Sequence, residues 1–359
     1  MLKRYSPFGA KVATVAMAAA LALLSVPGYG SDKTPSKKTS KKSKELVWPL
    51  PPEQPRLRFI TEIHGTEDVE PSKKQSGLER LSGVHRKEFK PYFNKPFGVA
   101  VDSKGRIFVT DNGQAMAFVF DREHHQVSYI GVGGPPKLMT PMGIHADAKD
   151  RIWIADAEAK KVFALDSQLT LRAAIGKQDE MINPVAIATD LSRNRLYVVD
   201  SQQHCVLVYD SETGQFLTKF GKRGSEDGEF NFPTDVAVGV DGRVYIADAM
   251  NRRVQIFDTD YKFIDKFGQE GLRWGQFRKP KSLALDEYQN IYVVDSDFCN
   301  FQIFDQKKQL LMFLGEFGDG PGQFEVPQQI RIGGENMVYV VDQMNQRVQI
   351  FKLLNGTPE

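Results

Sequence analysis

The sequence predicts an all-β fold, a six-bladed β-propeller in which each blade is a four-stranded antiparallel sheet. Three observations lead to this fold class. A unit of about 45 residues recurs six times along the chain. Each unit contains short apolar strands separated by polar or glycine turns. The last unit is one strand short, and a matching strand precedes the first unit.

Each unit begins at a proline and has an aspartate at the end of its second strand. The units start at Pro96, Pro141, Pro184, Pro233, Pro280 and Pro327. The aspartates are Asp111, Asp156, Asp200, Asp248, Asp295 and Asp342. A third strand follows, as in RVQIFD at Arg253–Asp258, and a fourth usually ends in glycine, as in FLTKFG up to Gly221. No unit contains a ten-residue helical period, which excludes a parallel α/β array.

The ring is predicted to close through a strand from the N-terminal side. The sixth unit ends after its third strand, at Leu354. Residues 55–65, PRLRFITEIHG, have the alternating pattern of an outer strand. Pairing this strand with the last blade removes an exposed sheet edge. Residues 66–95 are then a long polar passage into the first blade.

The repeat resembles that of NHL-repeat propellers over residues 55–354. Its marks are the blade proline, a GR-apolar-Y/F-apolar-x-D strand, an N-x-R-V-Q-I-F strand and an F-G-x-x-G-x-x-x-G-Q-F connection. The fourth blade carries them at Gly242–Asp248, Asn251–Phe257 and Phe267–Phe277. The fifth and sixth blades keep most of these marks, whereas the first and second have lost many.

The N-terminal 45 residues predict export. Three basic residues precede an apolar run from Val12 to Val26, and small residues follow, so residues 1–30 are interpreted as a signal peptide. An uncleaved membrane anchor is the alternative. Residues 31–45 hold six lysines and no large apolar residue, which is typical of a disordered tether. This basic segment also permits contact with anionic lipid. We expect a periplasmic or extracellular location and a monomer.

The folded part, residues 46–359, is mildly acidic. The whole chain carries +2, and residues 1–30 and 31–45 contribute +3 and +4, which leaves −5 for the remainder. RNA binding is known for some NHL propellers. The export signal and the acidic propeller argue against nucleic acid as a partner here.

The strand-end aspartates are predicted to be structural, each bonding turn amides or an arginine of its own blade, such as Arg253 or Arg347. Aspartates in the first hairpins are interpreted in the same way. Cys205 and Cys299 belong to non-adjacent blades and are expected to form no disulfide, which requires Cα atoms within about 7 Å. They have no CxxC spacing that would suggest a metal or redox site.

The inner strands line the channel of a propeller, and a few of their residues depart from the small apolar norm. The candidates for a channel-mouth site that binds a polar or anionic ligand are His145, Asp235, Lys281, Gln328, Gln329 and Arg331. A water-filled channel with solvated side chains is the alternative.

Some enzymes with related folds have their catalytic residues on the inner strands. NHL-like peptide-amidating lyases bind a metal through inner histidines, and related six-bladed lactonases use inner carboxylates with calcium. The resemblance therefore implies that a catalytic site in this chain would use inner-strand histidines or carboxylates. Here His145 and Asp235 are the only inner-strand candidates of those kinds. We therefore assign no catalytic residue, no metal ligand and no cofactor, and keep a metal-dependent lyase or lactonase as the alternative function.

A second candidate surface is the face formed by the turns after the strand-end aspartates and the connections before the blade prolines. Its predicted binding residues are Arg223, Arg252, Arg273, Trp274, Arg278 and Arg347, near Lys222, Arg253 and Phe298. Arginine and tryptophan dominate interface hot spots. Packing between blades is the alternative for some of them. The leading hypothesis is a non-catalytic scaffold that binds a protein or an anionic cell-surface polymer through this face.

Overall fold

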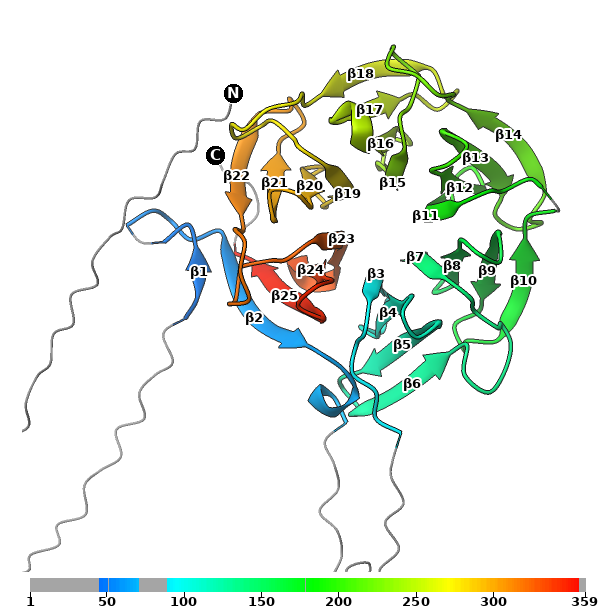
Figure 1. Cartoon of the computed structure of the whole chain (residues 1–359), viewed down its shortest axis with the longest axis horizontal. Coiled ribbons are helices and arrows are strands. Elements are labelled where there is room, and N and C mark those ends of the chain that lie inside the picture. Colours follow the sequence, from blue (N-terminus) through cyan, green and yellow to red (C-terminus); the bar gives the residue numbers. More distant parts are fainter. Residues whose placement is uncertain (1–44, 51, 71–88, 178, 355–359) are drawn as a thin grey trace, which may run out of the picture. The chain divides into compact units, whose positions relative to one another are not determined.

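The computed structural model describes residues 45–50, 52–70, 89–177 and 179–354. These residues form six antiparallel sheets arranged as blades around a central axis (Figure 1), which confirms the predicted six-bladed β-propeller. The predicted signal peptide and all of the lysine-rich segment except Glu45 lie outside the described residues. Among the described residues, no helix is both long enough and apolar enough to cross a membrane.

The first five blades each contain four strands. Blade one has β3 (Pro96–Val101), β4 (Ile107–Asp111), β5 (Met116–Asp121) and β6 (Gln126–Ile130). Blade two has β7 (Pro141–Ala146), β8 (Ile152–Asp156), β9 (Lys161–Leu165) and β10 (Leu171–Ile175). Blade three has β11 (Pro184–Asp190), β12 (Arg195–Asp200), β13 (Cys205–Asp210) and β14 (Phe216–Phe220).

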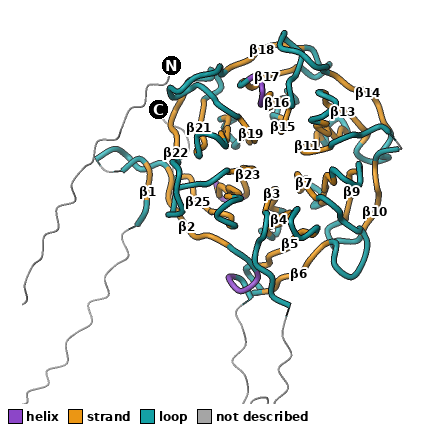
Figure 2. The backbone as a smooth tube through the Cα atoms, in the orientation of Figure 1, coloured by secondary structure: helices purple, strands orange, loops and turns teal. Residues whose placement is uncertain are grey.

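Blade four has β15 (Pro233–Val238), β16 (Val244–Asp248), β17 (Arg253–Phe257) and β18 (Phe263–Phe267). Blade five has β19 (Pro280–Leu285), β20 (Ile291–Asp295), β21 (Asn300–Phe304) and β22 (Leu310–Leu314). Short 3₁₀ turns occur at η1 (Thr66–Asp68), η2 (Ala249–Asn251) and η3 (Gly334–Asn336). The connections between strands are otherwise loops and turns, as Figure 2 shows.

Blade six joins the two ends of the described chain. It contains β23 (Pro327–Gly333), β24 (Met337–Asp342) and β25 (Arg347–Leu353), and its outer strand is β2 (Leu57–Ile63). β2 pairs antiparallel with β25, with Ile63 opposite Val348, which confirms the predicted closing strand. A fifth strand, β1 (Val47–Trp48), pairs with the outer side of β2 and was not predicted from the sequence.

Apolar side chains between neighbouring blades hold the ring together. Val341 and Ile350 of blade six pack in one cluster with Val109 and Phe118 of blade one. The second strands are buried along their whole length in four of the blades, because sheets cover them on both faces. In blades three and six the first residue of the second strand is partly exposed, and the rest of the strand is buried.

The six strand-end aspartates are structural, as the sequence predicted. All six are 0% exposed. Each carboxylate accepts a hydrogen bond from the backbone N–H two residues before the proline of its own blade. These donors are Asn94, Met139, Ile182, Asn231, Arg278 and Glu325, at 2.6–2.7 Å. The buried carboxylates therefore fix the point at which the chain enters each blade.

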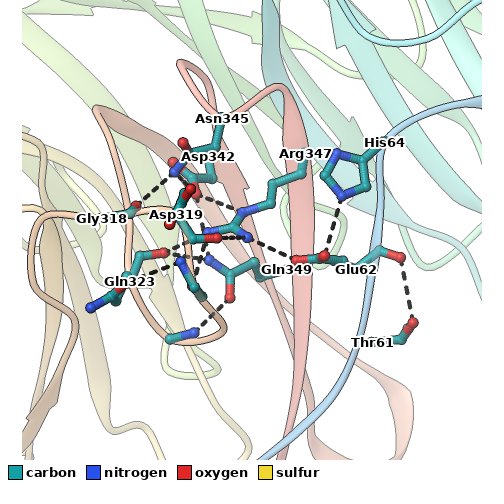
Figure 3. Close-up of polar contacts among 12 residues, drawn as sticks. Thr61, Glu62, His64, Gly318, Asp319, Gln323, Asp342, Asn345, Arg347 and Gln349 are labelled. Carbon is teal, nitrogen blue, oxygen red and sulfur yellow. Dashed lines mark hydrogen bonds and ion pairs between the residues drawn. The ribbon is translucent and has the colours of Figure 1, made fainter. Parts of the chain in front are cut away.

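An arginine and a glutamine of the third strand clamp the incoming connection in blades four and six. Figure 3 shows the clamp of blade six. Arg347 donates to the Asp342 carboxylate at 2.9 Å and to the backbone carbonyls of Asp319, Gly320 and Gln323. It also forms an ion pair with Glu62 of β2 at 2.9 Å. This one side chain ties together blade six, the connection from blade five and the closing strand.

We expect Arg347→Met to lower the free energy of unfolding by about 3–5 kcal/mol, because the variant leaves buried Asp342 without its cation. Glu62→Gln removes the charge of a partly exposed carboxylate that lies beside Arg347 and His64, and should cost about 1 kcal/mol or less. Urea unfolding of both variants measures the difference. Equal losses would show that the clamp does not depend on the buried carboxylate and the carbonyls.

Candidate functional site

The predicted arginine-rich face divides into exposed and buried members. Arg223, Arg273 and Arg278 are exposed and form no ion pair with the residues that the structure describes. Arg252 is one-third exposed, and its guanidinium lies 3.4 Å from the Glu270 carboxylate. Arg347 is a correction to the predicted set. Its side chain is only 3% exposed, because the clamp described above uses its guanidinium.

Trp274 lies in the connection from blade four to blade five and stacks on Phe313 of β22. The ring centroids are 3.5 Å apart and the planes differ by 12°. In the preceding blade, Asp227 occupies the position of Trp274 in the F-G-x-x-G-x-x-x-G motif, and Lys266 occupies the position of Phe313 in the outer strand. Asp227 and Lys266 form an ion pair. An aromatic stack has therefore replaced a solvated ion pair in blade five.

This aromatic pair stands among other exposed apolar side chains. Trp274 is 56% and Phe313 38% exposed. Leu272, in the same connection, is 78% exposed, and Phe317, in the next connection, is 70% exposed. We call Leu272, Arg273, Trp274, Phe313 and Phe317 the blade-five surface.

Two open hollows flank the stacked rings. One, of about 350 Å³, is lined by Arg273, Trp274, Gly268 and Gly275 together with two glutamines. The other, of about 330 Å³, is lined by Phe313, Trp48 and the start of the next connection. Surface hollows beside exposed aromatic side chains are a common feature of binding sites.

Sequence reasoning missed Phe313, although a signal was present. The equivalent outer-strand position holds Lys219 in blade three, Lys266 in blade four and Glu62 in blade six. β22 also reads LLMFL and contains no polar residue, whereas β14 and β18 each carry charge. Comparing the outer strands position by position marks blade five as different.

The connection that carries Trp274 also lacks the arginine clamp. Asn300 occupies the position of Arg253 and Arg347, and its side-chain oxygen is buried without a hydrogen-bond partner. Gln302 still accepts from the Gly275 N–H at 2.7 Å. Gln302 also donates to the Gln276 carbonyl at 3.0 Å, and the stack on Phe313 adds a contact where the arginine clamp is absent.

Most of the predicted channel residues bond to neighbouring blades. At the second position after the blade proline, a side-chain oxygen accepts the N–H of the next blade in three successive cases. Asp235 accepts from Leu283 at 3.1 Å, Ser282 from Ile330 at 3.2 Å and Gln329 from Val99 at 2.7 Å. Asp235 and Gln329 therefore hydrogen-bond one blade to the next.

Arg331 extends from blade six to blade four along the channel wall. Its guanidinium makes a bidentate ion pair with Asp235, with N···O distances of 2.9 and 3.1 Å, and donates to the backbone oxygen of Leu283. Asp235 is 1% exposed and also accepts from Ser282. The carboxylate that motivated a channel metal site thus has its oxygens occupied by the protein itself.

Three predicted channel residues remain. His145 lies 2.9 Å from the Thr189 hydroxyl, and burial lowers its pKa to about 4. Gln328 donates to Gln343 at 3.3 Å. The Lys281 ammonium lies 5.4 Å from the ring centre of Phe97 and has no hydrogen bond or ion pair with the described residues. Ligand binding by the channel residues stays a prediction.

Potential metal ligands and the two cysteines are the other reactive groups among the described residues. In the described part of the chain, no three His, Cys, Asp or Glu residues are grouped so that they could hold a metal ion. Cys205 is a buried free thiol, and burial raises its pKa to about 11. Cys299 is a partly buried free thiol in blade five.

Comparison with known proteins gives matches to the repeat and to the fold. The family model DUF5128, described as a 6-bladed beta-propeller, matches residues 188–266. NHL repeat-containing protein 2 of Bos taurus is 29% identical over 97 residues, which cover 24% of this chain and 13% of that protein. The E3 ubiquitin-protein ligase NHLRC1 of Homo sapiens is 29% identical over 90 residues, which cover 25% and 22%. The match thus spans less than a quarter of either relative.

Among solved structures, a protein of unknown function from Bacteroides thetaiotaomicron has a TM-score of 0.57 at 18% identity, with 73% of this chain and 70% of that chain covered. A streptogramin B lyase has a TM-score of 0.55 at 10% identity, with 72% and 94% covered. At such identities the likeness concerns the fold alone.

We expect Arg331→Met to destabilise the protein by about 3–5 kcal/mol, because Asp235 is left as a buried charge without a cation. The double variant with Asp235→Asn should recover part of that loss, since the buried charge is then absent. Urea unfolding of the single and double variants measures both values. A loss below about 1 kcal/mol for the single variant would contradict a clamp across three blades.

His145 should make the propeller sensitive to acid. Because its pKa is lowered to about 4 from 6.5, the unfolded chain binds the extra proton between these values. Stability is therefore lost as the pH falls through this window, by about 2 kcal/mol at pH 5 relative to pH 8. His145→Gln should lose about that much less than the wild type in unfolding experiments at the two pH values. Parallel losses would rule out a buried neutral imidazole.

Proposed function

Because the chain is an NHL-type six-bladed β-propeller, we propose that it is a non-catalytic scaffold that binds a protein partner through the blade-five surface. The observation that carries this proposal is the exposed stack of Trp274 on Phe313, at positions where the preceding blade has the Asp227–Lys266 ion pair. The closed ring of sheets holds the connection that presents these side chains.

The composition of this surface favours a protein partner. Exposed clusters of large apolar side chains mark interaction sites on soluble proteins. Tryptophan and arginine contribute most to protein–protein affinity, and Trp274 and Arg273 are adjacent here. One relative is named as a ubiquitin ligase, an enzyme that acts on proteins, and this name agrees with a protein partner.

The charge of the surface favours an acidic partner segment. Arg273 and Arg278 are exposed and form no ion pair with described residues, and Lys279 follows directly. Complementary charge increases the rate of association and selects among partners. An anionic cell-surface polymer would use the same arginines, but would gain less from Leu272 and Phe317.

We place this function outside the cytoplasm, in the periplasm or the extracellular space. The support is the basic start, apolar run and small-residue exit within residues 1–30. The lysine-rich segment that follows would act as a tether, near a membrane if the N-terminal segment is retained. Fractionation of cells that express the full chain, with N-terminal sequencing of the product, tests this placement.

The alternative function, a metal-dependent lyase or lactonase, has weaker support. The lyase match concerns the fold alone, and Asp235 is occupied by Arg331 and Ser282. One stoichiometric divalent ion in the purified protein would favour this alternative over the scaffold.

We expect Trp274→Ala and Phe313→Ser each to lower the capture of the native partner from an envelope fraction at least tenfold. Loss of the stack should cost only about 1 kcal/mol of stability, so the melting temperature should change little. Arg273→Glu with Arg278→Glu should weaken capture further at low salt, because it reverses the charge beside the stack.

The matched control is Phe216→Ser. Phe216 is also 38% exposed and also lies on an outer strand, β14 of blade three. Its replacement should leave capture unchanged. Equal capture by wild type and the Trp274 and Phe313 variants would refute the blade-five surface as the binding site. Equal losses at Phe216 would indicate a general effect of folding.

A further inference from the structure

The mouth of the central channel is basic and carries no acidic side chain in the two rows that frame it. The inner strands converge around the axis in Figure 1, and each starts at a blade proline. The residues directly before these prolines are Lys95, Thr140, Asn183, Phe232, Lys279 and Val326. The residues directly after them are Phe97, Met142, Val185, Thr234, Lys281 and Gln328.

Lys281 is the cation of these rows that projects into the mouth. Its ammonium from blade five lies over the ring of Phe97 in blade one, 5.4 Å from the ring centre. Blade six lies between these two blades in the ring. The contact therefore places the ammonium within the mouth.

Asp235, the carboxylate whose charge acts on this ammonium, does not neutralise it. Asp235 is held by two nitrogens of Arg331, by the Ser282 hydroxyl and by the Leu283 N–H. No ion pair joins Asp235 to Lys281. The other polar residues of the row after the prolines have their own partners, since Thr234 donates to the Pro280 carbonyl and Gln328 to Gln343.

The position of Lys281 is costly for a charged group. Desolvation, with a smaller contribution from Lys279 and against the attraction of Asp235, lowers its pKa to about 8. A lysine retained at such a place without a counter-charge lowers stability, and groups of this kind are concentrated at binding sites. The contact with Phe97 offsets only part of the cost, because an aromatic ring attracts the ammonium but supplies no negative charge.

We propose that the channel mouth binds the carboxylate of a ligand that has an apolar body, with the Lys281 ammonium as its direct contact. A carboxylate supplies the one negative charge that the ammonium lacks, and oxygen acceptors for its N–H groups. Met142 in the same row is half-buried and offers apolar surface to the rest of the ligand, beside the Phe97 ring under the ammonium. This site is separate from the blade-five surface and does not depend on the function proposed there.

Two sources offer this chemistry, a small carboxylic acid and the chain end of a peptide. Benzoate and its uncharged isostere benzamide represent the first source. An apolar tripeptide with a free C-terminal carboxylate, and the same peptide with an amidated end, represent the second source. In each pair the body is unchanged and only the charge differs.

The experiment is NMR of the propeller with ¹³C-methylated lysines, in which Lys281→Arg identifies the Lys281 signal by its absence. Benzoate should shift this signal in a saturable way and raise the pKa of Lys281, whereas benzamide should not. The free-acid tripeptide should bind more tightly than benzoate if a chain end is the natural ligand, and no more tightly if a small acid is. Both outcomes support a carboxylate site.

Variants then test the contact directly. Lys281→Met should weaken benzoate binding at least tenfold, while Lys281→Arg keeps most of the affinity. Lys279→Met is the matched control, an exposed lysine two residues away, and should weaken binding less than threefold. Benzoate binding that is unaffected by Lys281→Met would overturn the proposal, and so would equal shifts of the Lys281 signal with benzoate and benzamide. If Lys281→Met does not fold, the comparison of the two probes on the wild type still decides.

Discussion

The buried aspartate at the end of each second strand is the interaction on which the other features of this ring depend. Its carboxylate is withdrawn from water and must be satisfied by the protein, because an unpaired buried charge costs several kcal/mol. The required donors are the backbone N–H groups at the entry to the same blade, together with turn amides or an arginine. One side chain thereby fixes the spacing between the start of the first strand and the end of the second.

This constraint explains which parts of the repeat are free to vary. The strand-end aspartate has the same role in all six blades, whereas the residues that hold the incoming connection differ. Blade four uses Arg253 and an ion pair, blade six uses Arg347 and Glu62, and blade five uses an aromatic stack. Because the ring is already fixed, one blade can exchange a solvated ion pair for exposed apolar surface.

The channel residues also differ in their roles. Asp235, Ser282 and Gln329 use their side chains to hold the next blade, and Arg331 spans three blades to neutralise Asp235. Lys281 has no such task among the described residues, and its position lowers its pKa. A polar channel residue is therefore a candidate for ligand binding only if contacts with neighbouring blades do not already occupy its side chain.

The sequence by itself determined the number of blades, the strand order within each and the strand that closes the ring. These features follow from a pattern along the chain, since alternation and turn residues act between near neighbours. The role of the strand-end aspartates was also predictable, because their partners lie within the same blade. β1 was not, because a two-residue strand leaves almost no periodic pattern.

Only the tertiary structure decided which side chains meet between blades. Arg331 and Asp235 are 96 positions apart, and their contact depends on the radius of the ring and on the length of the arginine side chain. The bond from Arg347 to its strand-end aspartate was predictable, whereas the carbonyls of the preceding connection that bury this arginine were not. Trp274 and Phe313 belong to different repeat motifs, and the stack they form depends on how one blade packs against the next.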